Sequence, residues 1–303
     1  MIKFFSVKSS VKNELVNVRV VGFLISILLY GCSVQNLAIK YAGGIFDSGV
    51  KAIFSETDYE IAKVSIPANL KLLEAIYNAE PKNQKTVTLL VQGYTGYAMG
   101  FVEDDEPERA KMIYKRAYSY GINFLRWKSG RFAESLDGDF EKFEMTLRTE
   151  FGRKDVPILF WTAMAWGSYV NLSRDDPEAI SQIPKIESMV KYVVELDEGY
   201  FYGSGVMFLG VLLSARPKLF GGDPEKGKEY FERCIKISGG KYLLPYVFYA
   251  RYYAVQVQDR QLYEQLLNYV IESHVEVLEG AELLNVIAKR KAEKFKTMVE
   301  EFF

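Results

Sequence analysis

Aromatic and small residues recur along this chain at the spacing of a helical hairpin, and this pattern constrains the fold more than any other feature. Residues 86–122 fit a helix-turn-helix repeat of about 34 residues. In this repeat the first helix carries residues in the order bulky, bulky, small, bulky, and the second helix carries them in the order small, bulky, small. Small residues let two antiparallel helices approach while aromatic side chains fill the seam. The matching residues are Tyr94, Tyr97, Ala98 and Phe101, then Ala110, Tyr114 and Ala117; without an insertion, the same order returns at Tyr246, Tyr249, Ala250 and Tyr253, then Leu262, Leu266 and Tyr269.

Two looser copies lie between these repeats. Residues 157–172 and 200–215 are predicted first helices, and their second helices carry Ile186, Val190 and Val193 in one case and Gly227, Phe231 and Cys234 in the other. Accessory helices are expected at 59–79 and 134–151, and an amphipathic end cap with outward basic residues at 282–302. The predicted fold is therefore all-α: a tetratricopeptide-like helical repeat solenoid of about four helix-turn-helix pairs plus accessory and capping helices.

The N-terminal residues have the order of a bacterial lipoprotein signal. Basic residues precede a short apolar run at 20–30, which ends in Leu29-Tyr30-Gly31-Cys32. The run is too short for a membrane span, which needs about 20 apolar residues. We predict a signal peptide at 1–31, a lipidated Cys32 with a linker to residue 57, and a repeat domain at 58–303 held on a membrane by acyl chains. A buried strand followed by an ordinary cysteine is the alternative.

Composition argues against an enzyme. His274 is the only histidine, so His-based zinc sites and Ser-His-Asp triads cannot be assembled, and no phosphate-binding glycine loop occurs. A net charge of -1 offers no bulk attraction to nucleic acid. With Cys32 lipidated, Cys234 has no disulfide partner and is expected in the core. We expect no metal and no cofactor.

Two acidic runs precede prolines at predicted helix starts. They are Glu103-Asp104-Asp105-Glu106 and Asp175-Asp176. Carboxylates at these places favour the positive end of the helix dipole. We interpret both runs as helix caps and not as acid/base pairs.

The repeat residues resemble those of the T component of tripartite ATP-independent periplasmic (TRAP) transporters, a family of lipoproteins built from tetratricopeptide-like repeats. The resemblance runs from about Asp58 to Ile271. It is densest at 159–167 (LFWTAMAWG), 220–226 (FGGDPEK), 239–241 (GGK), 249–254 (YARYYA) and 258–260 (QDR).

This resemblance implies a periplasmic, membrane-tethered accessory protein of a secondary transporter. It also implies self-association, as a trimer, and work with the substrate-binding protein that delivers organic acids to the permease. An alternative function of another class is a non-catalytic scaffold that docks protein clients at the outer membrane. The wall of the repeat groove and the neighbouring genes would distinguish the two.

The repeat template places part of each first helix on an inner, concave wall. That wall is apolar and carries one cation, Arg251, whose planar fork suits a ligand carboxylate. The remaining candidates are Trp166, Met207, Met99 and Tyr169 for the ligand's hydrocarbon, Gly203 and Gly210 for clearance, and Thr95 beside them. The alternative is an internal salt bridge from Arg251 to Asp259 or Glu264, with the inserted helix 134–151 covering the wall.

Overall fold

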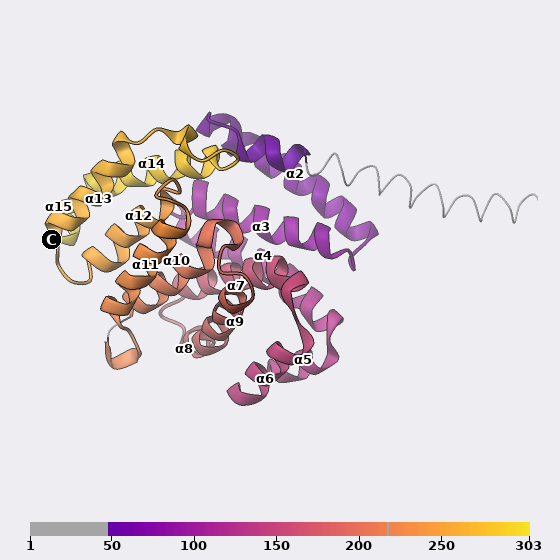
Figure 1. The fold of residues 1–303 in the computed structure, drawn as a ribbon. Coiled ribbons are helices and arrows are strands. Elements are labelled where there is room, and N and C mark those ends of the chain that lie inside the picture. The colour runs from indigo at the N-terminus through magenta and orange to yellow at the C-terminus, as the bar shows by residue number, and fades with distance from the viewer. Residues whose placement is uncertain (1–47, 217) are drawn as a thin grey trace, which may run out of the picture. The chain divides into compact units, whose positions relative to one another are not determined.

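The computed structural model describes residues 48–216 and 218–303 and divides the chain into two units, Met1–Ala52 and Ile53–Phe303. Cys32 and the signal peptide lie outside the described residues, so both stay predictions. The described residues contain helices and no strand, which confirms the all-α repeat fold (Figure 1). None of their helices is long and apolar enough to cross a membrane.

The second unit consists of helices that follow one another along the chain. Their bounds are α2 Tyr59–Ala79, α3 Gln84–Phe101, α4 Pro107–Lys128, α5 Gly130–Ser135, α6 Phe140–Glu150, η1 Arg153–Asp155, α7 Val156–Asn171, α8 Pro177–Ser181, α9 Ile183–Leu196, α10 Tyr200–Ser214, η2 Lys218–Phe220, α11 Pro224–Ile237, α12 Leu244–Phe248, η3 Tyr249–Ala254, α13 Arg260–Glu272, η4 Val275–Val277, α14 Glu282–Thr297 and α15 Val299–Phe302.

Four predicted helix pairs are present in this part of the chain: α3 with α4, α7 with α9, α10 with α11, and α12–η3 with α13. The small residues expected at the first seam, Ala98, Ala110 and Ala117, are fully buried. Cys234 also lies in the core, and burial raises the pKa of its thiol to about 12. Between α7 and α9, the additional residues form the short helix α8. The inserted helix predicted at 134–151 is α6, which packs on α9 and on the short helix α5 that precedes it.

The last pair departs from the template by one residue. The buried residues of α13 are Tyr263, Leu267 and Val270, each one position after the predicted Leu262, Leu266 and Tyr269. Its first helix contains the π-helical segment η3, in which a turn takes an additional residue. A template without insertions therefore places the second helix one residue out of register.

Glycine sets the distance between α10 and α11. A Cβ added to Gly210 would lie 3.1 Å from the carbonyl oxygen of Gly227 and 3.2 Å from the ring of Phe231. The start of α10 is also unusual, because Phe201 and Tyr202 have φ of 47° and 59°, a left-handed conformation that non-glycine residues rarely adopt. The ring of Phe201 packs edge-on against Trp161, with centroids 4.7 Å apart, and this buried contact offsets the backbone cost.

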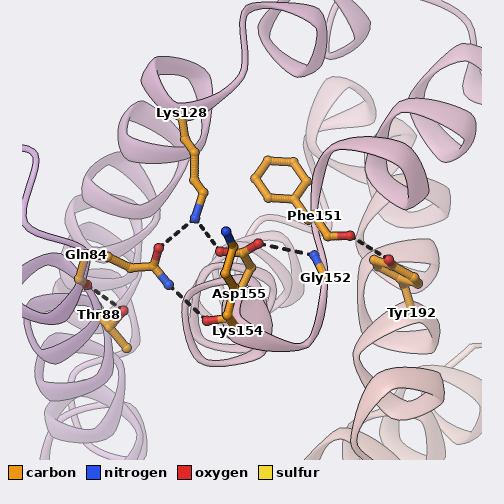
Figure 2. Close-up of polar contacts among 8 residues, drawn as sticks. All are labelled: Gln84, Thr88, Lys128, Phe151, Gly152, Lys154, Asp155 and Tyr192. Carbon is orange, nitrogen blue, oxygen red and sulfur yellow. Dashed lines mark hydrogen bonds and ion pairs between the residues drawn. The ribbon is translucent and has the colours of Figure 1, made fainter.

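A buried carboxylate fastens the start of α7 to two earlier helices (Figure 2). The Asp155 side chain is 1% exposed and forms an ion pair with Lys128 at the end of α4. Lys128 Nζ also donates to Gln84 Oε1 of α3 at 2.7 Å, and Gln84 Nε2 donates to the Lys154 carbonyl at 3.1 Å. Tyr192 Oη of α9 donates to the Phe151 carbonyl at 2.7 Å. These bonds hold α3, α4, α7 and α9 in one arrangement.

The last long helix returns to the first two. Helix α14 contacts α2 and α3 as well as α12 and α13. Its Lys291 was expected to face water but is buried, and its Nζ lies 2.7 Å from Asp104 Oδ2 after α3. Lys294 pairs with the neighbouring Asp105, with Nζ 2.5 Å from Oδ1. The C-terminal helix is therefore both an end cap and a closing element.

We predict that Asp155→Ala lowers the free energy of unfolding by about 3–5 kcal/mol, because it leaves the Lys128 charge without its buried partner. Urea unfolding of the full chain measures the change. Asp175→Ala is the matched control, because that carboxylate is exposed on the α7–α8 turn. Equal effects of the two substitutions would show that the buried pair contributes nothing.

Candidate functional site

The acidic run after α3 does not cap α4. Asp104 and Asp105 pair with α14. Glu106 occupies the N-cap position of α4 but accepts no capping hydrogen bond from the helix backbone; its carboxylate accepts from the Arg109 side chain at 2.7 Å. Glu103 points to α4, where Tyr114 Oη donates to its Oε2 at 2.5 Å. The capping interpretation is wrong for Glu103, Asp104 and Asp105, because their carboxylates bind a tyrosine hydroxyl or lysine ammonium groups instead of the start of α4. Glu106 does occupy the N-cap position. The capping interpretation is right for Asp176, which accepts from Glu178 N at the start of α8.

Glu103 belongs to a group of polar side chains that we call the central polar cluster. It is built by the turn after α3, by α4, by the end of α7 and the turn after it, and by η3. The other members lie around Tyr252: burial raises the pKa of this phenol most, Glu103 raises it further, and Arg251, Arg174 and Asn171 lower it. The members of the cluster are Glu103, Tyr114, Asn171, Arg174, Arg251 and Tyr252.

Burial dominates the electrostatics of this cluster. It raises the pKa of Glu103, and the nearby Lys291 and the Tyr114 hydrogen bond only partly oppose that rise. Burial and the Glu103 carboxylate together raise the pKa of Tyr114 well above its usual range. The pKa of Tyr252 is raised to about 12, again mainly by burial. The phenols are therefore neutral hydrogen-bond donors at physiological pH.

Arg251 and Arg174 are the charged members without a carboxylate partner in the described part of the chain; Arg174 donates to Asn171, whereas Arg251 contacts aromatic rings. The Arg251 guanidinium carbon lies 4.3 Å from the ring centroid of Phe302 and 5.9 Å from that of Tyr252. The expected alternative partners are engaged elsewhere: Asp259 caps α13 by accepting from Leu262 N, and Glu264 pairs with Arg260. Arg251 is only partly buried, so its N–H groups keep access to a further acceptor.

The other predicted ligand residues lie on α3, α7 and α10. Trp166 is buried and stacks on Tyr118 of α4, with ring centroids 5.0 Å apart. Met207 is buried, while Met99 is partly buried against the core. Thr95 is buried and its hydroxyl has no hydrogen-bond partner among the described residues.

Tyr169 is partly buried, and the Lys115 ammonium lies 5.8 Å from its ring centroid. The cation–π contacts of Arg251 are with Phe302 and Tyr252, not with Trp166 or Tyr169.

The two candidate glycines do not provide clearance for a ligand. The space beside Gly210 is filled by α11, as described above. Gly203 has φ of 79°, and a Cβ there would lie 3.2 Å from the side chain of Ile237, also on α11. This part of the expectation is corrected, because the glycine face of α10 packs against its own hairpin partner.

Sequence reasoning missed Glu103, Tyr252 and Phe302 as neighbours of the arginine site. Tyr252 had a local signal, since it adjoins Arg251 in the chain. Glu103 was assigned with its acidic neighbours to a helix end, and Phe302 was taken as part of the end cap. Neither residue has a local pattern that places it near Arg251. No group of side chains that could hold a metal ion occurs within the described ranges.

The chain was compared with protein families and with curated proteins. The family model described as the TRAP transporter T-component matches residues 55–303. An uncharacterized protein of Treponema pallidum (strain Nichols) is 22% identical to the chain, and the alignment covers 96% of this chain and 99% of the relative.

The raised pKa of Glu103 predicts a pH-dependent contribution to stability. Because its folded-state pKa lies above the unfolded value, its protonation stabilises the fold below about pH 4.5, and this contribution is lost as the pH rises through the folded pKa. Glu103→Gln keeps an acceptor for Tyr114 but does not titrate. Relative to the unmodified chain, we expect its free energy of unfolding to increase from about pH 4 to about pH 8.

Chemical denaturation at the two pH values measures that difference. Glu108→Gln is the control, because the Glu108 side chain is 85% exposed. An identical pH response of both variants would contradict the assignment to Glu103.

Proposed function

Because the chain belongs to the TRAP transporter T-component family, we propose that it is a periplasmic accessory protein of a TRAP-type secondary transporter. The family match spans nearly the whole helical unit and supports a transport role over the alternative of a general scaffold. The proposal includes a lipid anchor at Cys32, supported by the order of basic, apolar and small residues before it.

The ligand of this protein, in our proposal, is a small organic acid with an apolar part. Arg251 carries the proposal, because a partly accessible arginine without a carboxylate partner in the described chain is suited to bind one from a ligand. The rings of Phe302 and Tyr252 lie beside its guanidinium. These rings hold the guanidinium in place and offer an apolar surface for the hydrocarbon part of the ligand.

The proposed macromolecular partner is the substrate-binding protein of the same transporter. A net charge of -1 gives no strong electrostatic steering, and a delivery step requires release as well as binding. A transient complex of standard interface size fits these requirements. Self-association, as a homotrimer, is the further expectation for the assembly.

We predict that Arg251→Met weakens binding of a carboxylate ligand by about 2–5 kcal/mol, the scale for removing one member of a buried charge pair. Isothermal titration calorimetry of the full chain with a panel of short aliphatic carboxylates measures it. The affinity of Arg251→Lys should fall between those of Arg251→Met and the unmodified chain, because lysine keeps the positive charge but lacks the planar guanidinium. Arg131→Met is the control, since the Arg131 side chain is 81% exposed. Unchanged affinity in Arg251→Met would contradict the ligand role.

The partner assignment predicts a complex between the full chain and the TRAP substrate-binding protein of the same organism. Sedimentation velocity should detect it at micromolar concentrations, and a periplasmic binding protein of an unrelated transporter should not sediment with the chain. Failure to associate over that range, both with and without the organic acid, would favour the scaffold function.

A further inference from the structure

A polar cavity that Arg251 does not line lies where the last long helix meets the first. It has a volume of about 250 Å³ and opens between the first turns of α2, the end of α3 with the turn after it, and α14. Figure 1 shows α14 and the start of α2 side by side, in agreement with the contacts between these helices. Its charged lining residues are Lys63, Arg290, Lys291, Lys294, Glu60, Asp104 and Asp105.

The charges of this cavity do not cancel. Lys291 neutralises Asp104 and Lys294 neutralises Asp105 through the ion pairs that close the array. Lys63 and Arg290 have no ion-pair partner among the described residues, and the remaining carboxylate of the lining, Glu60, is exposed. The cavity therefore carries an excess of one positive charge with two uncommitted cationic side chains.

An aromatic ring positions one of these cations. The Arg290 guanidinium carbon lies 5.2 Å from the ring centroid of Tyr59, and Tyr59 Oη donates to the Gly100 carbonyl at 3.0 Å. The ring is thereby fixed at its polar end and occupies one face of the guanidinium. The N–H edges of Arg290 remain able to donate, because they lie in the plane of the group.

We propose that this cavity binds a compact oxyanion, a phosphate group in particular. Arg290 would supply paired N–H donors and Lys63 a mobile ammonium, the two complementary ways in which proteins hold phosphate oxygens. The phosphate has two physical sources, a soluble anion or the headgroup of an anionic phospholipid. The second source depends on the proposed anchor at Cys32, which precedes α2 in the chain. The site itself shares neither Arg251 nor Phe302 with the organic-acid site, so either site can fail without the other.

Isothermal titration of the full chain with inorganic phosphate, in neutral detergent micelles, tests the cavity. Lys63→Gln and Arg290→Gln should each weaken phosphate binding about tenfold, the scale of one hydrogen bond to a charged group, and the double variant should lose it. Lys226→Gln on α11 is the control, because this lysine is exposed and does not line the cavity. Binding should weaken as salt is added.

The same titration in micelles that contain phosphatidylglycerol identifies the source. A lower apparent affinity for phosphate would show that the lipid headgroup occupies the cavity, and an unchanged affinity would assign the site to a soluble anion. Circular dichroism confirms that each variant stays helical. Absence of phosphate binding by the unmodified chain, or full binding by the double variant, would overturn the proposal.

Discussion

A lysine buried between the two ends of the helical array is the interaction on which the rest of this domain depends. The Lys291 side chain is 4% exposed, and its ammonium is compensated by Asp104, which is 22% exposed. Separating the two would leave a charge in a poorly solvated place, which costs far more than breaking a surface pair. The approach of α14 also requires Gly100, because a Cβ there would lie 2.6 Å from the Ile287 side chain. Charge and close packing together bring the last helix to the first.

Closure by α14 explains the unusual electrostatics inside the array. Lys291 is near enough to lower the pKa of Glu103, yet burial outweighs it, so that the pKa is raised. The segment after α14 supplies Phe302, whose ring covers the guanidinium of Arg251. The phosphate cavity has one wall from α14 as well. Both candidate sites are thus products of the same closing contact, although they use different side chains.

The helical array contains strained backbone conformations where packing contacts compensate for their free-energy cost. Phe201 and Tyr202 adopt left-handed backbone conformations at about 1–3 kcal/mol each. In exchange, Phe201 enters an aromatic group with Trp161 and Tyr200, and Tyr202 Oη donates to the Gly280 carbonyl before α14. Contacts with α7 and with the turn before α14 therefore determine the backbone conformation at the start of α10. Helix propensity alone would not produce this conformation.

The sequence by itself determined the helices and their seams, because both depend on residues a few positions apart. Ala98, Ala110 and Ala117 lie where the hairpin period places them, and the interface residues of α9 and α11 follow the same rule. The spacing of the hairpin repeat could not reveal the π-helical turn in η3, because one additional residue in a turn does not change the types of residue present. That turn places Tyr263 in the buried position expected for Leu262. Register was therefore predictable only up to that turn.

Only the tertiary structure decided which charges are paired and which are free. Lys291 and Asp104 are 187 residues apart, so an amphipathic pattern assigned the lysine to water and the aspartate to a helix cap. Arg251 was identified from its template position, but the engagement of Asp259 and Glu264 elsewhere depends on the start of α13. The sequence indicated open space beside Gly210, but in the fold α11 fills that space. Helical periodicity is a local property, whereas the solvation and pairing of a charge depend on everything that packs around it.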